Sequence, residues 1–237
     1  KLFGAVIVLF GIQAYKDAAQ VLKASDSVLG SDYIVISKPV SAMTTLAGAL
    51  GAGPRSFDEG EIEEISSLKG VTSVATFRTA QFTVYGGISY GGFDMSTEMF
   101  LESVPDEFLD VDPSVWTATP DSDVIPVVIP QTYLNFYNYG FAAARGTPQL
   151  GKELFSMVPI RLVLRGREGR MTYTGKIVGL TDRLNTILVP EDFMIEANNR
   201  FATEKPKEPS RLIIEAGADA SKELIDHINS EGYVIDG

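Results

Sequence analysis

The sequence predicts an α+β protein in which strand-helix units at the two ends of the chain enclose a centre rich in strands. The first unit combines an apolar, β-branched segment at 33–36 with an amphipathic helix that follows it. The last unit runs from an apolar segment at 211–216 through a second amphipathic helix to residues 233–235. Between these units, short β-branched and aromatic segments alternate with Gly and Pro, which is typical of strands joined by turns.

An apolar helix is predicted ahead of the first strand. Leu2–Ala14 carries no charge, and residues 15–29 continue with apolar positions at helical spacing until Gly30. The uncharged run is shorter than the roughly 20 residues that span a bilayer. It fits a secretory signal behind Lys1, a buried core helix, or the outer end of a spanning helix. We favour the third interpretation, in which residues 1–30 are the end of a transmembrane helix and a stalk.

The first strand of the folded domain is expected at Tyr33–Ile36, and a long loop rich in Ser, Ala, Thr and Gly follows it. Ser56 and Glu59 have the spacing of a capping box, which predicts the start of a helix there. An apolar stripe then recurs at helical spacing, and Gly70 ends this helix. The stripe consists of Ile62, Ile65 and Leu68.

Strands are expected through the middle of the chain. Residues 71–85 are β-branched and aromatic, and an apolar strand is expected at 125–129. The glycine pairs at 86–87 and 91–92 are expected to break the chain into a hairpin.

An aromatic helix follows the strand at 125–129. Pro130 opens this helix and Gly140 ends it, because Pro is tolerated in the first turn and Gly favours a helix end. The helix carries Tyr133, Tyr137 and Tyr139, with Phe136 and Phe141 beside them. Such a group is ordinarily part of a core, but an amphipathic aromatic face also suits partner binding.

A second hairpin is expected from strands at Pro159–Leu164 and Met171–Leu180. Its tip is basic in an otherwise acidic chain, since it contains Arg165, Arg167 and Arg170. The ordinary interpretation is a solvated turn. The functional interpretation is a docking contact for an acidic partner.

The end of the chain is predicted to close the fold with a β-α-β unit. A polar linker with Pro at 206 and 209 precedes this unit. The elements expected from residue 187 onward are a short strand at 187–189, a helix at Glu191–Phe201, a strand at Arg211–Ala216, a helix that begins near Asp219 and ends at Gly232, and a strand at Tyr233–Ile235.

Composition excludes several classes of function. The chain has 237 residues with 20 basic and 31 acidic side chains, a net charge of −11, which argues against nucleic acid as a partner. It has no cysteine, so disulfides, thiolate metal sites and thiol nucleophiles are absent. The glycines at 48–53 lack the Lys and Ser/Thr of a phosphate loop, and the acidic residues lack the order of a calcium loop. We therefore expect no cofactor and no metal.

One short motif suggests catalysis. Residues 87–91 match the G-x-S-x-G pattern of a hydrolase nucleophile elbow around Ser89, and His227 follows later in the chain. The elbow requires a strand, a sharp turn and a helix, whereas Gly91-Gly92 indicates a turn into another extended segment. His227 is expected on a solvated helix face among acidic residues. We therefore expect no enzymatic activity and assign no catalytic residue.

Several segments resemble, in order, the extracytoplasmic domains of FtsX-like, MacB-type ABC transporter permeases. The resemblance covers nearly the whole chain as a pattern of elements. The segments are Tyr15-Lys16-Asp17-Ala18 leading into Gly30–Ser37, then Leu68-Lys69-Gly70-Val71, then Gly175–Leu180 with Leu188-Val189-Pro190, and finally Ile213–Ile235.

The resemblance implies a domain inserted between the first two membrane helices of a permease. Residues 31–90 and 207–237 would form a porter-like α/β subdomain, and residues 91–206 an inserted, mainly β subdomain. The implied function is to couple the ATP-driven motion of a cytoplasmic partner to substrate export or partner engagement outside the membrane. The departure from the complete family is the lack of a phosphate loop and of a later spanning helix.

The implied location is the inner membrane, with this domain in the periplasm. The implied partners are a cytoplasmic ATP-binding subunit, a second permease copy, a periplasmic adaptor, and the membrane through the N-terminal helix. Two other interpretations remain open: a secreted serine hydrolase that uses Ser89, and a free-standing periplasmic binding protein whose first helix belongs to its core.

Overall fold

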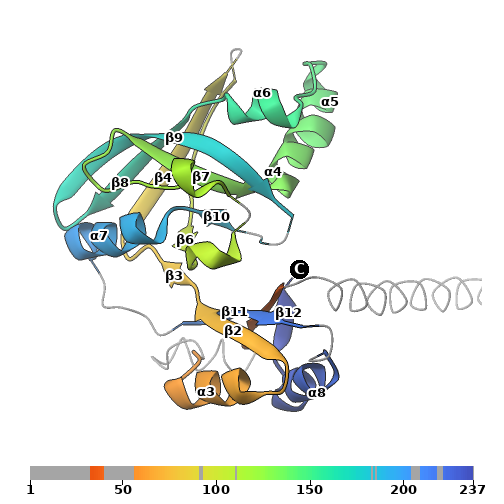
Figure 1. The fold of residues 1–237 in the computed structure, drawn as a ribbon. Coiled ribbons are helices and arrows are strands. Elements are labelled where there is room, and N and C mark those ends of the chain that lie inside the picture. The colour runs from red at the N-terminus through yellow and green to blue at the C-terminus, as the bar shows by residue number, and fades with distance from the viewer. Residues whose placement is uncertain are drawn as a thin grey trace, which may run out of the picture.

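The computed structural model describes residues 33–39, 56–90, 93–109, 111–182, 184, 186–203, 209–217 and 221–236. These residues form a four-stranded sheet covered by two helices, and an eight-stranded sheet that carries further helices (Figure 1). The α+β class expected from the sequence is confirmed. The apolar helix and stalk expected over residues 1–30 lie outside the described residues. Within the described ranges, no helix has both the length and the apolar character needed to cross a membrane.

The four-stranded sheet is built from segments far apart in the sequence. Its elements are β1 (Tyr33–Ser37), α3 (Glu59–Ser67), β2 (Val71–Thr76), β11 (Arg211–Ala216), α8 (Ser221–Glu231) and β12 (Val234–Asp236). The strand order is β12-β1-β11-β2, and every neighbouring pair is antiparallel. The connection through α3 therefore joins β1 to β2 past β11, and the connection through α8 joins β11 to β12 past β1. This arrangement makes two interleaved split β-α-β units.

α3 and α8 cover one face of the four-stranded sheet, below it in Figure 1. Successive residues of a strand point to opposite faces, so Ile34 and Ile36 of β1 point to the helices while Val35 points away. Ile65 of α3 and Ile228 of α8 are buried against this face. The other buried members of this cluster are Phe57, Leu212, Ile214 and Leu224.

α3 begins two residues later than the sequence suggested. Asp58 is its N-cap, and the Asp58 carboxylate accepts a hydrogen bond from the Glu61 N–H at 2.9 Å. The Glu61 carboxylate accepts one from the Asp58 N–H at 2.9 Å. Asp58 and Glu61 thus form the capping box, rather than Ser56 and Glu59. Glu61 also pairs with the Lys38 ammonium at 2.6 Å, which ties the segment after β1 to α3.

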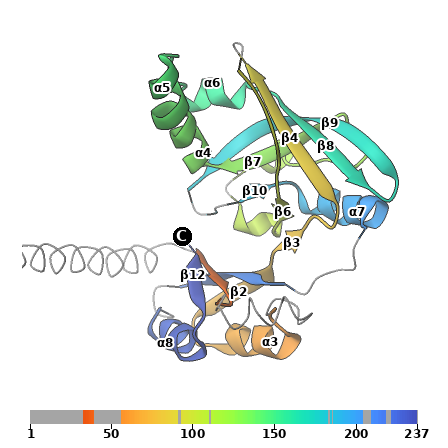
Figure 2. The same cartoon turned by 180° about the vertical axis from the view of Figure 1, so that it is seen from behind.

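The eight-stranded sheet has the order β3-β6-β10-β7-β9-β8-β4-β5. It is antiparallel except for the β6/β10 and β7/β9 pairs, which are parallel. Its strands are β3 (Arg78–Thr79), β4 (Thr83–Tyr90), β5 (Phe93–Glu98), β6 (Leu101–Ser103), β7 (Val124–Pro130), β8 (Ile160–Gly166), β9 (Gly169–Thr181) and β10 (Ile187–Leu188). Figure 2 shows β4 and β8 side by side along the back of this sheet.

The first of the two glycine pairs expected to break the chain does not end a strand. Gly86 and Gly87 lie inside β4, where they pair with Thr97 and Ser96 of β5. β4 continues to Tyr90, so the first glycine pair does not break the strand. A glycine can replace a larger residue in a strand where a neighbour fills the space, and the Met99 side chain occupies the volume that a Cβ on Gly86 would need.

The core of the eight-stranded sheet lies on its inner face, against α7 (Glu191–Phe201). The helix expected at these residues is confirmed. Its buried side chains include Phe193, which lies edge-on to Tyr173 of β9 at 5.9 Å between ring centroids. Phe201 at its last residue lies edge-on to Phe82 at 5.8 Å. Aromatic pairs in this geometry add to the apolar burial that holds α7 on the sheet.

The aromatic helix after β7 is longer than predicted. It runs through α4 (Gln131–Asn135), a π-helical segment η3 (Phe136–Ala142) and α5 (Ala143–Arg145). Gly140 lies inside this helix, and the chain leaves it at Gly146, whose φ of 65° suits a helix end. Asn138 anchors the π-helical segment, since its side-chain amide donates to the Leu150 carbonyl at 2.9 Å and accepts from the Leu150 N–H at 2.8 Å.

The other face of the four-stranded sheet packs against the eight-stranded sheet through one apolar cluster. This cluster includes Val35 of β1, Val128 of β7 and Leu188 of β10. Trp116, the single Trp of the chain, is buried there, and its indole N–H donates to the Asp106 carboxylate at 2.9 Å. We call this cluster the inter-sheet core. Its buried members are Val35, Phe77, Val104, Phe108, Trp116, Val128, Leu184, Leu188 and Ile213.

Polar contacts close the edge of the inter-sheet core. The Arg211 guanidinium of β11 donates to the Glu102 carboxylate of β6 and lies 4.3 Å from the centroid of the Phe77 ring. Phe77 is the residue at which the chain passes from β2 to β3. The chain therefore passes from the four-stranded to the eight-stranded sheet at Phe77, and β3 and β4 pair within the eight-stranded sheet. The subdomain boundary between residues 90 and 91 stays a prediction.

The close approach of β8 to α7 predicts a specific cost at Gly166. A Cβ added at Gly166 would overlap the carbonyl oxygen of Phe201. We expect Gly166→Ala to lower the free energy of unfolding by about 1–3 kcal/mol, measured by urea denaturation. The control is Gly140→Ala, where the nearest atoms to a Cβ are 3.8 Å away. An equal loss of stability in both variants would contradict the close approach.

The Tyr233 hydroxyl, which donates to Glu61 at 3.3 Å, predicts a pH dependence of stability. Burial, followed by the charge of Glu61, raises the pKa of Tyr233 to about 12. Its contribution to stability is therefore fully present below the unfolded-state pKa of about 10 and is lost as the pH rises towards 12. We expect the free energy of unfolding to fall over this range more steeply in the wild type than in Tyr233→Phe. Tyr139→Phe should keep the wild-type slope, and identical slopes for all three proteins would refute this assignment.

Candidate partner-binding surfaces

The candidate residues from the sequence lie on two separate surfaces. Arg165 and Arg170 are on the β8/β9 hairpin, whereas Tyr133 and Tyr139 are on the aromatic helix. No described contact joins the two groups. The candidate residues therefore form two surfaces, one basic and one aromatic.

The tip of the hairpin is engaged within the domain. Arg167 and Glu168 form the turn between β8 and β9, and Gly169 follows with a φ of 96°. The Arg167 N–H donates to the Phe201 carbonyl at 3.0 Å, and its guanidinium donates to the Asn199 carbonyl. These bonds satisfy carbonyls at the end of α7 that have no partner within the helix. Arg167 thus has a structural role, unlike the other two arginines predicted with it.

A residue of α7 also forms an ion pair with this turn. The Arg200 guanidinium of α7 donates to the Glu168 carboxylate at 3.1 Å and to the Asp121 carboxylate at 2.9 Å. These carboxylates raise the pKa of Arg200. Hydrogen bonds and ion pairs therefore hold the tip of the β8/β9 hairpin against the end of α7.

The outer face of the hairpin carries four cations, which we call the basic face: Arg161, Arg165, Arg170 and Lys176. Alternate residues of each strand point outward, the odd-numbered ones in β8 and the even-numbered ones in β9. The residues between them, such as Leu162 and Leu164, are buried in the core. All four cations are exposed, and none of them forms a salt bridge within the described part of the chain.

Arg165 and Arg170 are directly opposite each other across the two strands. Like charges in this position repel and destabilise a sheet. Arg165 also lies over the ring of Tyr85 on β4, with 5.0 Å from its guanidinium carbon to the ring centroid. This stacking holds the Arg165 side chain flat on the sheet but supplies no counter-charge.

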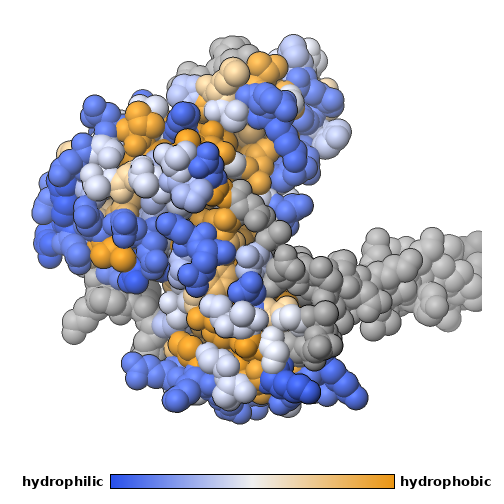
Figure 3. Space-filling model, viewed as in Figure 1, coloured by the Kyte–Doolittle hydropathy of each residue, from blue (hydrophilic) through white to orange (hydrophobic). Residues whose placement is uncertain are grey.

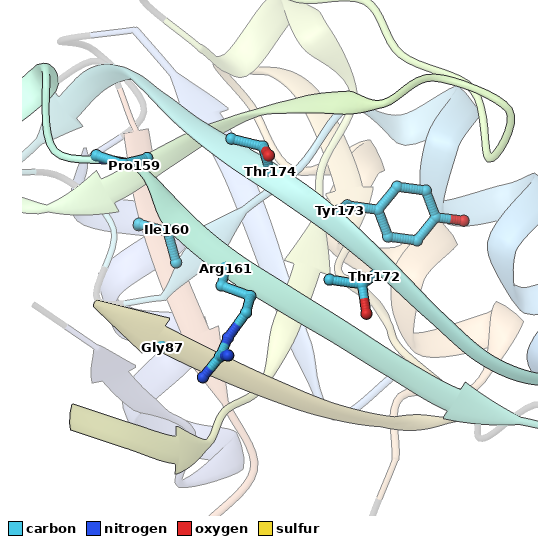
Figure 4. A pocket seen from close by; sticks show the side chains of 7 residues that line it. All are labelled: Gly87, Pro159, Ile160, Arg161, Thr172, Tyr173 and Thr174. Carbon is cyan, nitrogen blue, oxygen red and sulfur yellow. The ribbon is translucent and has the colours of Figure 1, made fainter. Parts of the chain in front are cut away.

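A hollow of about 420 Å³ opens beside Arg161 on the same face (Figure 4). Arg161 projects from β8 towards β4, where its neighbour across the strands is Gly87. Gly87 has no side chain to fill the space. Thr172 and Thr174 line the hollow from β9 and add hydroxyl groups beside the guanidinium. The hollow is therefore rich in hydrogen-bond donors.

The aromatic surface lies on the helix after β7 and on α6 (Lys152–Ser156). Tyr133 is 50% exposed, Phe136 77% and Tyr139 73%. Leu154 and Met157, at and just after α6, are also exposed, and Figure 3 shows apolar surface in this part of the molecule. Several exposed apolar side chains thus lie on neighbouring helices, whereas single exposed apolar side chains are ordinary on a protein surface.

Tyr137 differs from the other tyrosines predicted with it. It is half-buried, and its hydroxyl donates to the Pro148 carbonyl at 3.4 Å. Its ring lies 5.7 Å from that of Phe141. Tyr137 therefore belongs to the packing of the helix, and Tyr133 and Tyr139 remain available to a partner.

The nucleophile elbow suggested by the sequence does not form. Ser89 lies within β4 and pairs with Asp94 of β5, so no helix follows it. His227 is on α8, where its ring lies 6.1 Å from that of Tyr233, and it is half-buried rather than solvated as expected. Ser89 therefore lies in the eight-stranded sheet, whereas His227 lies on a helix that covers the four-stranded sheet. Among the described residues, no group of His, Cys, Asp and Glu side chains has the arrangement of a metal site.

Arg161 and Lys176 were not among the candidates predicted from the sequence. Both lie outside the charged turn, and the strand register brings them to the same face as Arg165 and Arg170. The available signal was parity, since Arg161 and Arg165 are four residues apart, and Arg170 and Lys176 are six apart.

Comparison with protein families gives a match over most of the chain. The family described as "PCD-like: Probable transporter periplasmic core domain" matches residues 34–237. The family resemblance predicted from the sequence is confirmed by this match. No curated protein matches the chain significantly.

Three solved structures are similar to the chain at low identity. The extracellular domain of the noncanonic ABC-type transporter YknZ from Gram-positive bacteria is 16% identical, with a TM-score of 0.35 over 86% of this chain and 98% of that one. The periplasmic region of MacB from Actinobacillus actinomycetemcomitans is 14% identical, with a TM-score of 0.40 over 88% and 89%. A domain of a putative permease protein from Porphyromonas gingivalis is 13% identical, with a TM-score of 0.38 over 88% and 91%. The assignment of the family rests on the family match alone.

The opposed arginines predict a substitution that stabilises the protein. We expect Arg170→Thr to raise the free energy of unfolding by about 0.2–1 kcal/mol, because it removes repulsion from Arg165. The gain should shrink in high salt, which screens exposed charges. Arg167→Thr in the same hairpin should instead lower stability by about 0.3–1 kcal/mol, since it removes a contact at the end of α7. If urea denaturation shows that both variants lose stability equally, repulsion between Arg165 and Arg170 does not lower the free energy of unfolding.

Proposed function

Because the chain belongs to the family of probable transporter periplasmic core domains, we propose that it is the extracytoplasmic domain of an ABC-type permease. In this role it relays the ATP-driven motion of a cytoplasmic partner to substrate export or to partner engagement outside the membrane. It does so without catalysing a reaction of its own.

The observation that carries this proposal is that the first and last described strands, β1 and β12, lie side by side. β1 and β12 are antiparallel neighbours, with Val35 opposite Asp236. The chain therefore enters the described fold at Tyr33 and leaves it after Asp236 at the same end of the same sheet. A domain inserted between consecutive membrane helices needs this arrangement, because both flanking segments must return to one membrane surface.

The inter-sheet core supports the relay. It includes Val35 of β1, the strand at the proposed point of attachment, together with Val128 and Leu188 of the eight-stranded sheet. A close-packed apolar interface of this kind transmits displacement, since packed cores have low compressibility. Movement of the attachment end therefore moves the basic and aromatic surfaces with it.

The partners follow from the proposed role. They are a cytoplasmic ATP-binding subunit, a second permease copy, and a periplasmic adaptor that meets the exposed surfaces of the eight-stranded sheet. The proposed location is the inner membrane, with the described residues on its outer side.

Fluorescent labels on the full-length permease test the relay. The chain has no cysteine, so single cysteines at Lys152 on α6 and Lys222 on α8 can be labelled after replacement of any others. In proteoliposomes with the ATP-binding subunit, energy transfer from each label to labelled lipid headgroups should change on addition of ATP. Energy transfer between the two labels should stay constant, because the inter-sheet core holds the sheets as one body.

An ATP-binding subunit that binds but does not hydrolyse ATP provides the control for cycling. The proposal is wrong if neither label moves relative to the membrane while ATP is hydrolysed at the normal rate. The rigid form of the relay is wrong if the distance between the labels changes with the cycle.

A further inference from the structure

We propose that the basic face binds an extended acidic segment of a partner protein, laid along β8 and β9. This inference names a partner for the proposed relay and rests on it only for the partner's location outside the membrane. The binding itself is argued from charge, shape and hydrogen-bonding capacity of the described face.

Charge is the first argument. The chain has a net charge of −11, and several of its described cations are paired within the domain, including Lys38 with Glu61 and Arg78 with Glu191. The four cations of the basic face have no such carboxylate within the described residues. Arg165 and Arg170 even oppose each other, a cost that a bound anion would remove. The face is therefore complementary to an acidic ligand.

Shape favours an extended chain over a compact anion. The side chains lie on two adjacent strands, which are about 4.8 Å apart, and Arg161 and Arg165 are about 13 Å apart along β8 at 3.3 Å per residue. Arg170 and Lys176 are about 20 Å apart along β9 by the same spacing. The cations thus form a narrow stripe that matches about six residues of an extended peptide. One small anion would contact a single pair.

The border of the stripe argues against a membrane surface as the ligand. Glu98 of β5 is exposed and lies opposite Tyr85 on the same face. A flat anionic bilayer over β8, β4 and β5 would bring phosphates against this carboxylate. A ligand one chain wide, laid along β8 and β9, would lie beside it.

The hollow beside Arg161 supplies a second kind of contact. A carboxylate in this space would meet the Arg161 guanidinium and the hydroxyls of Thr172 and Thr174. Guanidinium and carboxylate form strong, charge-assisted hydrogen bonds. The Tyr85 ring holds Arg165 in place further along the stripe, which reduces the entropy lost on binding.

The probe is fluorescein-labelled hexaglutamate, a peptide whose charges repel and keep it extended. Binding to the 237-residue chain is measured by fluorescence anisotropy at low and high salt. We expect binding that weakens with salt. The double variant Arg165→Gln/Arg170→Gln should weaken it about tenfold, the loss expected for two surface charge pairs.

The matched control removes the same charge elsewhere. Lys69→Gln/Lys222→Gln alters two exposed cations outside the eight-stranded sheet, and its affinity should stay within about twofold of the wild type. Circular dichroism checks that both variants fold. Equal losses in the two double variants would mean attraction by net charge alone and would overturn the proposal.

Two further probes separate the ligand classes. Citrate, a compact trianion, should compete at least tenfold more weakly than hexaglutamate per molecule, because it spans only one pair of cations. Vesicles of phosphatidylglycerol should not bind through this face. Vesicle binding that Arg165→Gln/Arg170→Gln abolishes, without peptide binding, would overturn the proposal in favour of a membrane contact. If the wild-type chain does not bind hexaglutamate while the labels in the permease move normally, this inference is refuted and the relay is left intact.

Discussion

The burial of Trp116 and its apolar neighbours between the two sheets is the contact on which the rest of the structure depends. The four-stranded sheet has apolar side chains on both faces, and α3 and α8 cover only one of them. Each large side chain in the inter-sheet core contributes about 1.5–3 kcal/mol of burial. Arg211 and Glu102 then join β11 to β6 at the edge of the core. Without this contact the second face of the four-stranded sheet would be exposed to water.

This constraint also explains where the surfaces lie. The outer face of the eight-stranded sheet is covered by the four-stranded sheet around Val128 of β7 and Leu188 of β10. The part formed by β9, β8 and β4 extends beyond that contact, and it carries the basic face. This sheet surface is thus apolar where it meets the four-stranded sheet and basic where it meets solvent.

The sequence predicted elements better than it predicted their partners. The helix Glu191–Phe201 and the strand Arg211–Ala216 have clear periodicity and compact bounds, and both were predicted at the residues where they form. The passage between sheets at Phe77 could not be predicted from the sequence, because strand pairing depends on long-range register that a local pattern does not contain. The candidate basic surface shows the same limit. The sequence shows the charges of Arg165 and Arg170, while the position of Arg161 on the same face follows only from the register of β8 with β9. The contact of Arg167 with α7 likewise depends on tertiary packing.

The central claim is that the inter-sheet core makes the two sheets one cooperative body. Native-state hydrogen exchange in increasing denaturant tests it most directly, by comparing amides of β11, such as that of Ile213, with amides of β7, such as that of Val127. The account predicts that both groups exchange through the same global opening, with equal free energies and equal dependence on denaturant. A separate opening of the four-stranded sheet, at lower free energy and with β7 still protected, would contradict it.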